Sequence, residues 1–207
     1  MESEKDSSDQ SSQPNLILVL GGARSGKSTF AERLALNSGR RVAFIATATA
    51  SDEDMRNRIS RHQAARPAHW STIEEPLQLS NAVREASAVA DVLILDCMTV
   101  WLSNWLFSQE ADEQMDTLSI SSHHYDAVLQ VIDDLLQVVT TLTAGKTLIV
   151  VTNEVGLGIV PAYALGRVYR DLLGIVNQRL AAVAPRVYLM VAGLGVDIKR
   201  LHEVATL

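Results

Sequence analysis

The chain has 207 residues, of which 47% are hydrophobic and 20% are charged, and its formal net charge at pH 7 is −6. These values are typical of one globular domain with a sizeable core, and they exclude a largely disordered chain. The acidic balance argues against a broad nucleic-acid surface, which needs a basic face, but allows a small anionic ligand in one local site.

The sequence also limits where the protein can work. No apolar run approaches the roughly 18 residues of a membrane-spanning helix, and the N-terminus lacks the apolar segment of a signal peptide. The single cysteine, Cys97, excludes an intrachain disulfide framework and a cysteine-rich zinc site. We therefore expect a cytoplasmic protein without stable membrane insertion.

In chain order, residues 1–15 come first and are rich in Ser, Asp, Glu and Gln without apolar periodicity. Such a segment cannot bury enough surface to offset its ordering entropy, so we expect a disordered tail. Residues 16–207 alternate apolar strand patterns with helical patterns and contain no internal repeat. This predicts a single α/β domain of P-loop type, with a doubly wound, mainly parallel sheet and helices on both faces.

A glycine-rich motif, G-x-x-x-x-G-K-S, occupies residues 21–28 between an apolar run at 16–20 and a helical pattern. Strand, loop and helix in this order are the context of a P-loop, whose backbone N–H groups surround a phosphate chain. Lys27 would reach the β- and γ-phosphates, and the Ser28 hydroxyl would bind Mg²⁺. The predicted phosphate-binding residues are Gly21, Gly22, Ala23, Arg24, Ser25, Gly26, Lys27 and Ser28.

After the P-loop helix, residues 42–46 predict a second strand, and 52–65 predict a charged helix that Pro67 ends. A helical pattern at 77–90 then leads into an apolar strand at 92–96 that ends in an acid. In a P-loop protein, an acid at such a strand tip is the Walker B candidate for holding Mg²⁺. Asp96 is therefore a predicted metal ligand, with capping of the next helix as the alternative.

The second half continues the alternation of helices and strands. An apolar helix, at 99–107, is expected to pack in the core or against a subunit, and 108–122 is expected to be an exposed loop with His123 and His124 facing solvent. Pro161 suits the first turn of the last helix. The remaining predicted elements are helices at 125–143 and 162–183 and strands at 147–151 and 187–191.

The carboxyl ends of parallel strands meet at the edge of the sheet that carries the P-loop. We therefore expect three groups to lie together there: Ala46 with Thr47, Asp96, and the run 152–154. The charged helix with its arginines and His62 adjoins one of these strand ends. A simple kinase needs in-line positioning and charge neutralisation, and it has no use for a nucleophile of its own.

Several further runs make the chain resemble the bifunctional adenosylcobinamide kinase/adenosylcobinamide-phosphate guanylyltransferase family of the cobalamin pathway. The resemblance extends from about residue 16 to residue 199. Beyond the P-loop, the runs that carry the resemblance stand in this order: FIAT at 44–47, DEDM at 52–55, RIxxHxxxRPAHW at 58–70, DCMT at 96–99, VTNEVGLGIVP at 151–161 and NQRLA at 177–181.

The resemblance implies two reactions. ATP or GTP phosphorylates adenosylcobinamide, and a histidine then takes GMP from GTP and passes it to adenosylcobinamide phosphate, giving adenosyl-GDP-cobinamide. It implies His62 as the guanylylated catalytic residue, with His69 as runner-up, and Mg²⁺ as cofactor. It also implies a homo-oligomer, by family likeness a trimer. Outside the P-loop, the nucleotide-binding residues it implies are Ala46, Thr47, Ala48, His62, Gln63, Ala64, Ala65, Glu74 and Asp96.

Two other functions stay open. One is a P-loop kinase of another small metabolite without a covalent intermediate, in which His62 is structural or contacts the substrate. The other is a nucleotide-dependent switch or binding module. The run Thr-Asn-Glu-Val at 152–155 lacks the base-selecting Asn-Lys-x-Asp pattern, which argues against a GTPase-like switch.

Overall fold

The computed structural model describes residues 15–49, 53, 56, 60, 63–64, 66–110 and 120–201. The predicted tail, apart from Asn15, and most of the predicted charged helix at 52–65 lie outside these residues. His62 and Ala65 are among the residues not described.

A seven-stranded sheet organises the molecule, with strand order β3-β2-β4-β5-β1-β6-β7. Every neighbouring pair is parallel except β6 and β7, which are antiparallel. The predicted mainly parallel α/β architecture is therefore confirmed. The strands are β1 (Asn15–Gly21), β2 (Val42–Ala46), β3 (Ser71–Glu74), β4 (Val92–Asp96), β5 (Thr147–Val151), β6 (Arg186–Val191) and β7 (Leu194–Asp197).

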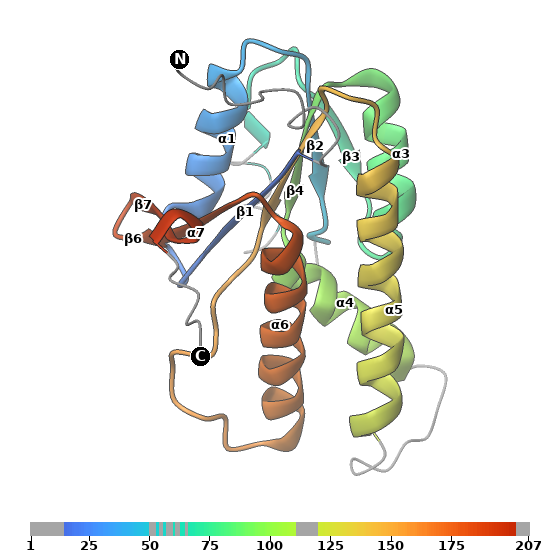
Figure 1. The fold of residues 1–207 in the computed structure, drawn as a ribbon. Helices are drawn as coiled ribbons and strands as arrows, with labels where there is room; N and C mark the ends of the chain where they lie inside the picture. The colour runs from blue at the N-terminus through green and yellow to red at the C-terminus, as the bar shows by residue number, and fades with distance from the viewer. Residues whose placement is uncertain are drawn as a thin grey trace, which may run out of the picture.

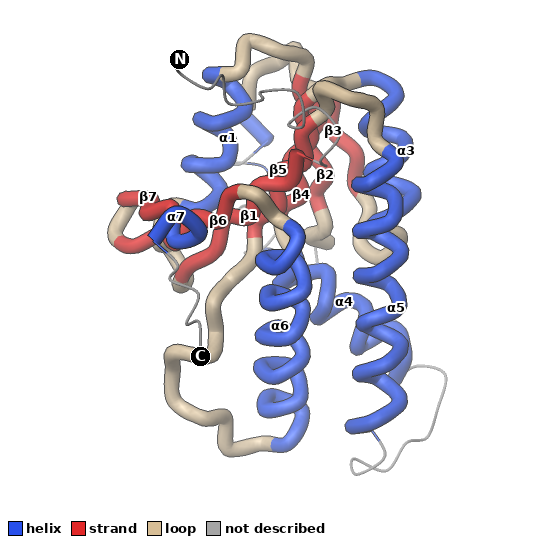
Figure 2. Tube along the Cα trace, in the orientation of Figure 1, coloured by secondary structure: helices blue, strands red, loops and turns tan. Residues whose placement is uncertain are grey.

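Helices cover both faces of the sheet (Figure 1). Helix α1 packs on one face, and α3, α4, α5 and α6 pack on the other; the tube view separates the same layers (Figure 2). In the described part of the chain, no helix is long and apolar enough to cross a membrane. The helices are α1 (Lys27–Asn37), α3 (Leu79–Val89), α4 (Met98–Glu110), α5 (Ile120–Thr141), α6 (Ala164–Val183) and α7 (Ile198–Leu201).

The two faces of β1 explain why its apolar run is continuous. Leu16, Leu18 and Leu20 join the core under α3 to α6, whereas Ile17 and Val19 join the core under α1. Successive strand side chains point to opposite faces, so a strand covered on both sides needs apolar residues at every position. Burying each such side chain contributes about 1.5–3 kcal/mol.

Two strands were missing from the sequence-based prediction, β3 and β7, and both are sheet edges. The sequence of β3 is Ser-Thr-Ile-Glu, and three of its four residues are exposed. In β7, Leu194, Gly195 and Val196 are exposed and only Asp197 is partly covered. An edge strand pairs on one side only and can do so without a buried apolar run, which removes the pattern that revealed the central strands.

Several predicted boundaries were wrong. The expected loop at 108–122 is helical at both ends, because α4 extends to Glu110 and α5 begins at Ile120. His124 is buried, with its ring edge-to-face against Trp105, and does not face solvent. Pro161 precedes the first turn of the last helix, since α6 begins at Ala164 with Tyr163 as its N-cap.

Candidate nucleotide site

The P-loop connects β1 to α1 through backbone conformations that favour glycine. Gly21 has φ of 152°, and a Cβ at this position would lie 2.5 Å from the carbonyl oxygen of Met190 on β6. Gly26, the N-cap of α1, has φ of 92°. Both conformations are unfavourable for residues with a side chain, so the loop depends on these two glycines.

The turn between β6 and β7 braces the P-loop from outside. The backbone N–H of Gly193 donates to the carbonyl oxygen of Ser25 at 3.0 Å. A Cβ on Gly26 would approach the Cα of Gly193 to 3.3 Å. The C-terminal hairpin therefore helps to fix the conformation of the phosphate-binding loop, a contact between segments far apart in sequence.

Lys27 is the first residue of α1 and only 8% exposed. Its Nζ donates to the carbonyl oxygen of Gly22 at 2.5 Å and lies 3.4 Å from Ser25 Oγ. The ammonium group of Lys27 thus folds back onto the P-loop. A phosphate bound by the loop amides would meet this cation directly.

A cavity of about 510 Å³ opens in front of the P-loop at the carboxyl edge of the sheet. It is the space where the predicted site residues come together, from the P-loop and from the ends of β2, β3 and β4. The predicted residues that line it are Ala23, Arg24, Ser25, Gly26, Lys27, Ser28, Ala46, Ala48, Gln63, Glu74 and Asp96.

The other predicted residues do not line the cavity or are not described. Gly21 and Gly22 shape the P-loop behind it, and Ala64 is exposed outside it. Thr47 is fully buried; its Oγ1 donates to the carbonyl oxygen of Cys97 and accepts from the N–H of Cys97, each at 2.8 Å. Thr47 therefore ties the end of β2 to the end of β4 from behind the cavity.

Sequence reasoning left out several cavity-lining residues, of which Arg66 and Asn153 carry polar groups suited to a ligand. We expected Asn153 at the edge of the sheet that carries the P-loop, but no role for it followed from the sequence. The other residues that it left out are Thr29, Phe44, Cys97, Val100 and Val151.

A buried polar network holds Asn153 in place. Its N–H donates to Thr99 Oγ1 at 2.8 Å, and its carbonyl oxygen accepts from Asn177 Nδ2 at 2.9 Å. Asn177 is 5% exposed and also accepts, at Oδ1, from the hydroxyl of Thr152 at 2.8 Å. Residues of α4, β5 and α6 are thereby joined directly behind the cavity, and their hydrogen bonds fix the end of β5.

Arg66 lies at the opposite wall. Its guanidinium carbon is 3.4 Å from the centroid of the Phe44 ring, a cation–π contact. Burial lowers the pKa of Arg66, and the negative charges of Glu32, Asp96 and Glu74 partly offset that shift. Next to it, the Gln63 amide donates to the Glu74 carboxylate at 2.9 Å. The cavity therefore has cations at both ends and acids at its edge.

Ser28 and Asp96 both line this cavity and are both partly exposed, so their oxygens are accessible from it. A hydroxyl and a carboxylate beside a phosphate chain suit Mg²⁺, which keeps several waters and binds few protein ligands. Among the described residues, no three His, Cys, Asp or Glu side chains form a protein-only metal cage. The donor set therefore fits a magnesium ion that arrives with a nucleotide.

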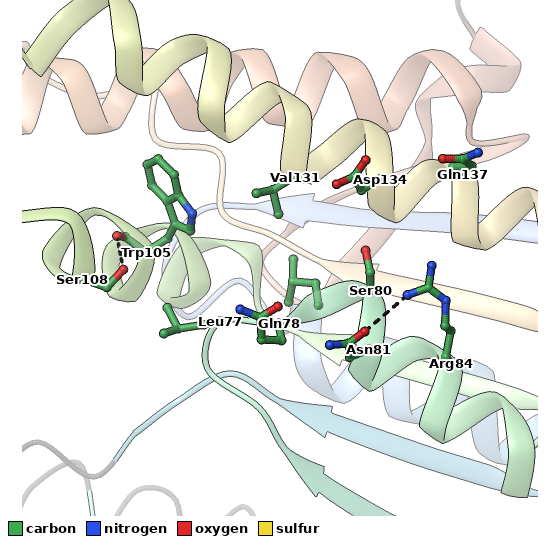
Figure 3. A pocket seen from close by; sticks show the side chains of 11 residues that line it. Leu77, Gln78, Ser80, Asn81, Arg84, Trp105, Ser108, Val131, Asp134 and Gln137 are labelled. Carbon is green, nitrogen blue, oxygen red and sulfur yellow. Dashed lines mark hydrogen bonds between the residues drawn. The ribbon is translucent and has the colours of Figure 1, made fainter.

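A second cavity, of about 360 Å³, lies between α3, α4 and α5 (Figure 3). Arg84 and Asp134 face it from two of these helices, and Arg84 Nη1 lies 3.3 Å from Asn81 Oδ1. It shares no lining residue with the cavity at the P-loop. None of the predicted nucleotide-site residues reaches it.

Comparison with known proteins gives matches that extend over most of the chain. The sequence model of cobinamide kinase / cobinamide phosphate guanyltransferase matches residues 17–198. The bifunctional adenosylcobalamin biosynthesis protein CobP of Pseudomonas aeruginosa is 42% identical, covering 88% of this chain and 96% of that protein. Proteins named bifunctional adenosylcobalamin biosynthesis protein CobU are 42% identical in Salmonella typhimurium and 40% identical in Escherichia coli, each covering 89% of this chain and 99% of the relative.

A solved structure supports the fold alone. An ATPase of a type III secretion system superposes with a TM-score of 0.56 at 11% identity, covering 94% of this chain and 60% of that protein. This agrees with a P-loop NTPase-like sheet. The resemblance inferred from the sequence runs is confirmed by the family match, which spans most of the chain.

Proposed function

The chain belongs to the cobinamide kinase / cobinamide phosphate guanyltransferase family, and we propose that it carries out both reactions on adenosyl-corrinoids at one nucleotide cavity. In the first, ATP or GTP phosphorylates adenosylcobinamide. In the second, GMP passes from GTP through a guanylyl-histidine to adenosylcobinamide phosphate. Homology makes the chain an enzyme of this class; the covalent intermediate and the individual substrates are our proposal.

One observation supports a shared site. The P-loop residues Lys27 and Ser28 line the same cavity as Asp96 and as Gln63, which is the direct sequence neighbour of His62. His62 itself lies outside the described residues, and its assignment rests on the family resemblance. A kinase centre with a nucleophile close by in the sequence could use one bound nucleotide for either reaction.

In the proposed kinase step, the P-loop amides and Lys27 hold the β- and γ-phosphates. The hydroxyl oxygen of the acceptor attacks the γ-phosphorus and its proton passes to solvent, while the bond to the bridging oxygen breaks and the nucleoside diphosphate leaves with that electron pair. Bound Mg²⁺ would neutralise charge on the phosphate oxygens, with Ser28 and Asp96 as its protein ligands.

In the proposed transferase step, the neutral imidazole of His62 attacks the α-phosphorus of GTP, and pyrophosphate leaves with the bridging oxygen. A phosphate oxygen of the corrinoid then attacks the same phosphorus. The nitrogen–phosphorus bond breaks, and its electron pair returns to the imidazole. The phosphoramidate is labile enough to serve as the intermediate.

The remaining assignments are also proposals by family likeness. Residues 16–207 act as one catalytic domain, the protein works in the cytoplasm, and it assembles as a homotrimer. Its partners are small molecules: ATP, GTP, adenosylcobinamide and adenosylcobinamide phosphate. We propose no nucleic-acid partner, in keeping with the net charge of −6.

Labelling with GTP radiolabelled at the α-phosphate tests the covalent route. Wild-type protein with Mg²⁺ should acquire an acid-labile, base-stable label, and His62→Ala should abolish the label and the guanylyltransferase activity. The same variant should keep its kinase activity, because phosphoryl transfer uses no protein nucleophile. Peptide mapping of the labelled wild type should locate GMP on His62.

His69→Ala is the matched control, because His69 is exposed and does not line the cavity. It should label like the wild type. Full labelling of His62→Ala would move the nucleophile to His69 or end the covalent mechanism. An unlabelled wild type with normal phosphorylation of a small metabolite would favour a simple P-loop kinase.

A further inference from the structure

Arg66 lines the nucleotide cavity and carries two buried hydrogen-bond donors. Its Nε and Nη1 are both inaccessible to solvent, and neither has an acceptor in the described part of the chain. Buried donors without partners each cost about 1–3 kcal/mol, so native proteins seldom keep them without a reason. A ligand that supplies acceptors is such a reason, since Arg66 lines the cavity itself.

The surroundings of Arg66 argue against a purely structural ion pair. Glu32, Asp96 and Glu74 are close enough to raise its pKa, yet none accepts a hydrogen bond from Nε or Nη1. The guanidinium is held by stacking on Phe44, which is 2% exposed. Stacking fixes the plane of the guanidinium group, and all of its donors lie in that plane.

The strand order places the ring on which Arg66 stacks on a different strand from the one that leads into the P-loop. Phe44 belongs to β2, whereas the P-loop follows β1, and β4 and β5 lie between them. At about 4.8 Å per strand, three steps separate these strands by roughly 14 Å. Lys27 and the loop amides already surround the position of the terminal phosphates. The N–H of Arg66 donates to the carbonyl oxygen of Gln63 at 3.2 Å, so Arg66 lies beside the segment that holds His62.

We propose that Arg66 is a further catalytic residue, which binds the non-bridging oxygens of the α-phosphate during guanylyl transfer. This inference rests on the proposed function. As the imidazole–phosphorus bond forms and the bond to pyrophosphate breaks, negative charge stays on those oxygens. Arg66 donates hydrogen bonds from its guanidinium group to them and holds the resulting GMP group, while Lys27 acts on the β- and γ-phosphates.

The test compares Arg66→Gln and Arg66→Lys with Arg33→Gln. Arg33 is a matched control, because its guanidinium also lies over an aromatic ring, that of Phe30 at 5.8 Å, but it is exposed outside the cavity. Arg66→Gln should slow GMP labelling about 10²–10³-fold, the usual effect of removing one oxyanion donor. Arg66→Lys should recover part of this rate, since it keeps the charge but loses the fork. Kinase turnover with ATP should change only a few-fold.

Equilibrium binding gives a second readout that does not need the covalent intermediate. Wild-type protein should bind GMP more tightly than guanosine, and Arg66→Gln should weaken GMP at least about tenfold while leaving guanosine unchanged. Unchanged GMP binding and labelling would overturn the role of Arg66, as would equal losses for kinase and transferase. An unlabelled wild type whose GMP affinity still depends on Arg66 would reject the covalent route and retain this contact.

Discussion

At the scale of single residues, the thiol of Cys97 lies beside the acid that ends β4 and lines the nucleotide cavity. Burial, and then the negative charge of Asp96, raises the pKa of Cys97 to about 11. The folded protein therefore favours the neutral thiol. The raised pKa of Cys97 stabilises the folded protein. This stabilisation is fully present below the ordinary pKa of 9.0 and is lost as pH rises towards 11.

This shift predicts that Cys97 reacts slowly with alkylating agents, since the thiolate is the nucleophile. At about pH 8, a shift of two units lowers the thiolate fraction about a hundredfold. The rate of iodoacetamide modification, followed by mass spectrometry, should rise steeply until pH approaches 11. The chain in denaturant serves as control and should react at the rate of a free cysteine. Fast modification of the native protein at about pH 8 would contradict the shift.

Single residues were predictable from sequence where their chemistry is local. The P-loop residues and Asp96 directly follow the strands that position them. The sequence pattern that predicts each strand therefore also predicts where these residues lie in the fold. Thr47 and Arg66 show the limit of this approach. Thr47 is paired with Cys97, fifty residues further along the chain, and Arg66 depends on the ring of Phe44 beneath it. Neither contact can be predicted from the residues next to it in the sequence.

At the scale of elements, α6 contains two glycines in different surroundings. A Cβ on Gly166 would lie 2.6 Å from the ring of Tyr163 and 2.9 Å from the Cβ of Pro161, whereas nothing lies within 4 Å of a Cβ on Gly174. Gly166 therefore allows the loop after β5 to pack against the first turn of α6. This contact also accounts for the late start of the helix, three residues beyond Pro161.

The pair makes a matched test. Gly174→Ala should raise the free energy of unfolding by about 0.5–1 kcal/mol, because alanine restricts the unfolded chain and suits a helix. Gly166→Ala should lower it by about 1–3 kcal/mol, since the new methyl group forces Tyr163 and Pro161 to move. Denaturant unfolding of both variants measures the difference. Equal stabilisation would mean that the loop packs elsewhere in solution.

Elements were predictable where apolar runs mark strands covered on both faces, as in β1, β2, β4, β5 and β6. The edge strands β3 and β7 lacked that pattern, although both bear on the site. Glu74 ends β3, and Gly193, just before β7, braces the P-loop. An edge strand pairs with the strand that lies next to it, and only the assembled sheet determines which strand that is.

At the scale of the whole molecule, the nucleotide cavity is lined by segments that follow several different strands of the sheet. The P-loop follows β1, Asp96 ends β4, and Glu74 ends β3, so the lining spans most of the width of the sheet. A nucleotide that contacts all of them should stabilise the folded state by mass action. At a hundred times its Kd, a ligand adds about 2.7 kcal/mol.

For a domain of this size, 1 kcal/mol corresponds to about 2–4 °C, so saturating GTP with Mg²⁺ should raise the Tm by roughly 5–10 °C. Lys27→Ala should lose most of this shift, because it removes the cation at the phosphate loop. Without nucleotide, its stability should fall by about 1 kcal/mol for the lost hydrogen bond from Nζ to the carbonyl oxygen of Gly22.

Removing the metal in the same experiment tests whether Asp96 acts through Mg²⁺. Asp96→Asn keeps the shape of the side chain but removes its charge, so its nucleotide-dependent rise in Tm should equal that of wild-type protein treated with EDTA. Adding EDTA to Asp96→Asn should then change little further, because the ion and the carboxylate act through each other. If EDTA lowers the wild-type shift but Asp96→Asn retains all of it, Asp96 caps α4 and the magnesium ligand lies elsewhere. Scanning calorimetry with and without GTP, Mg²⁺ and EDTA distinguishes these outcomes.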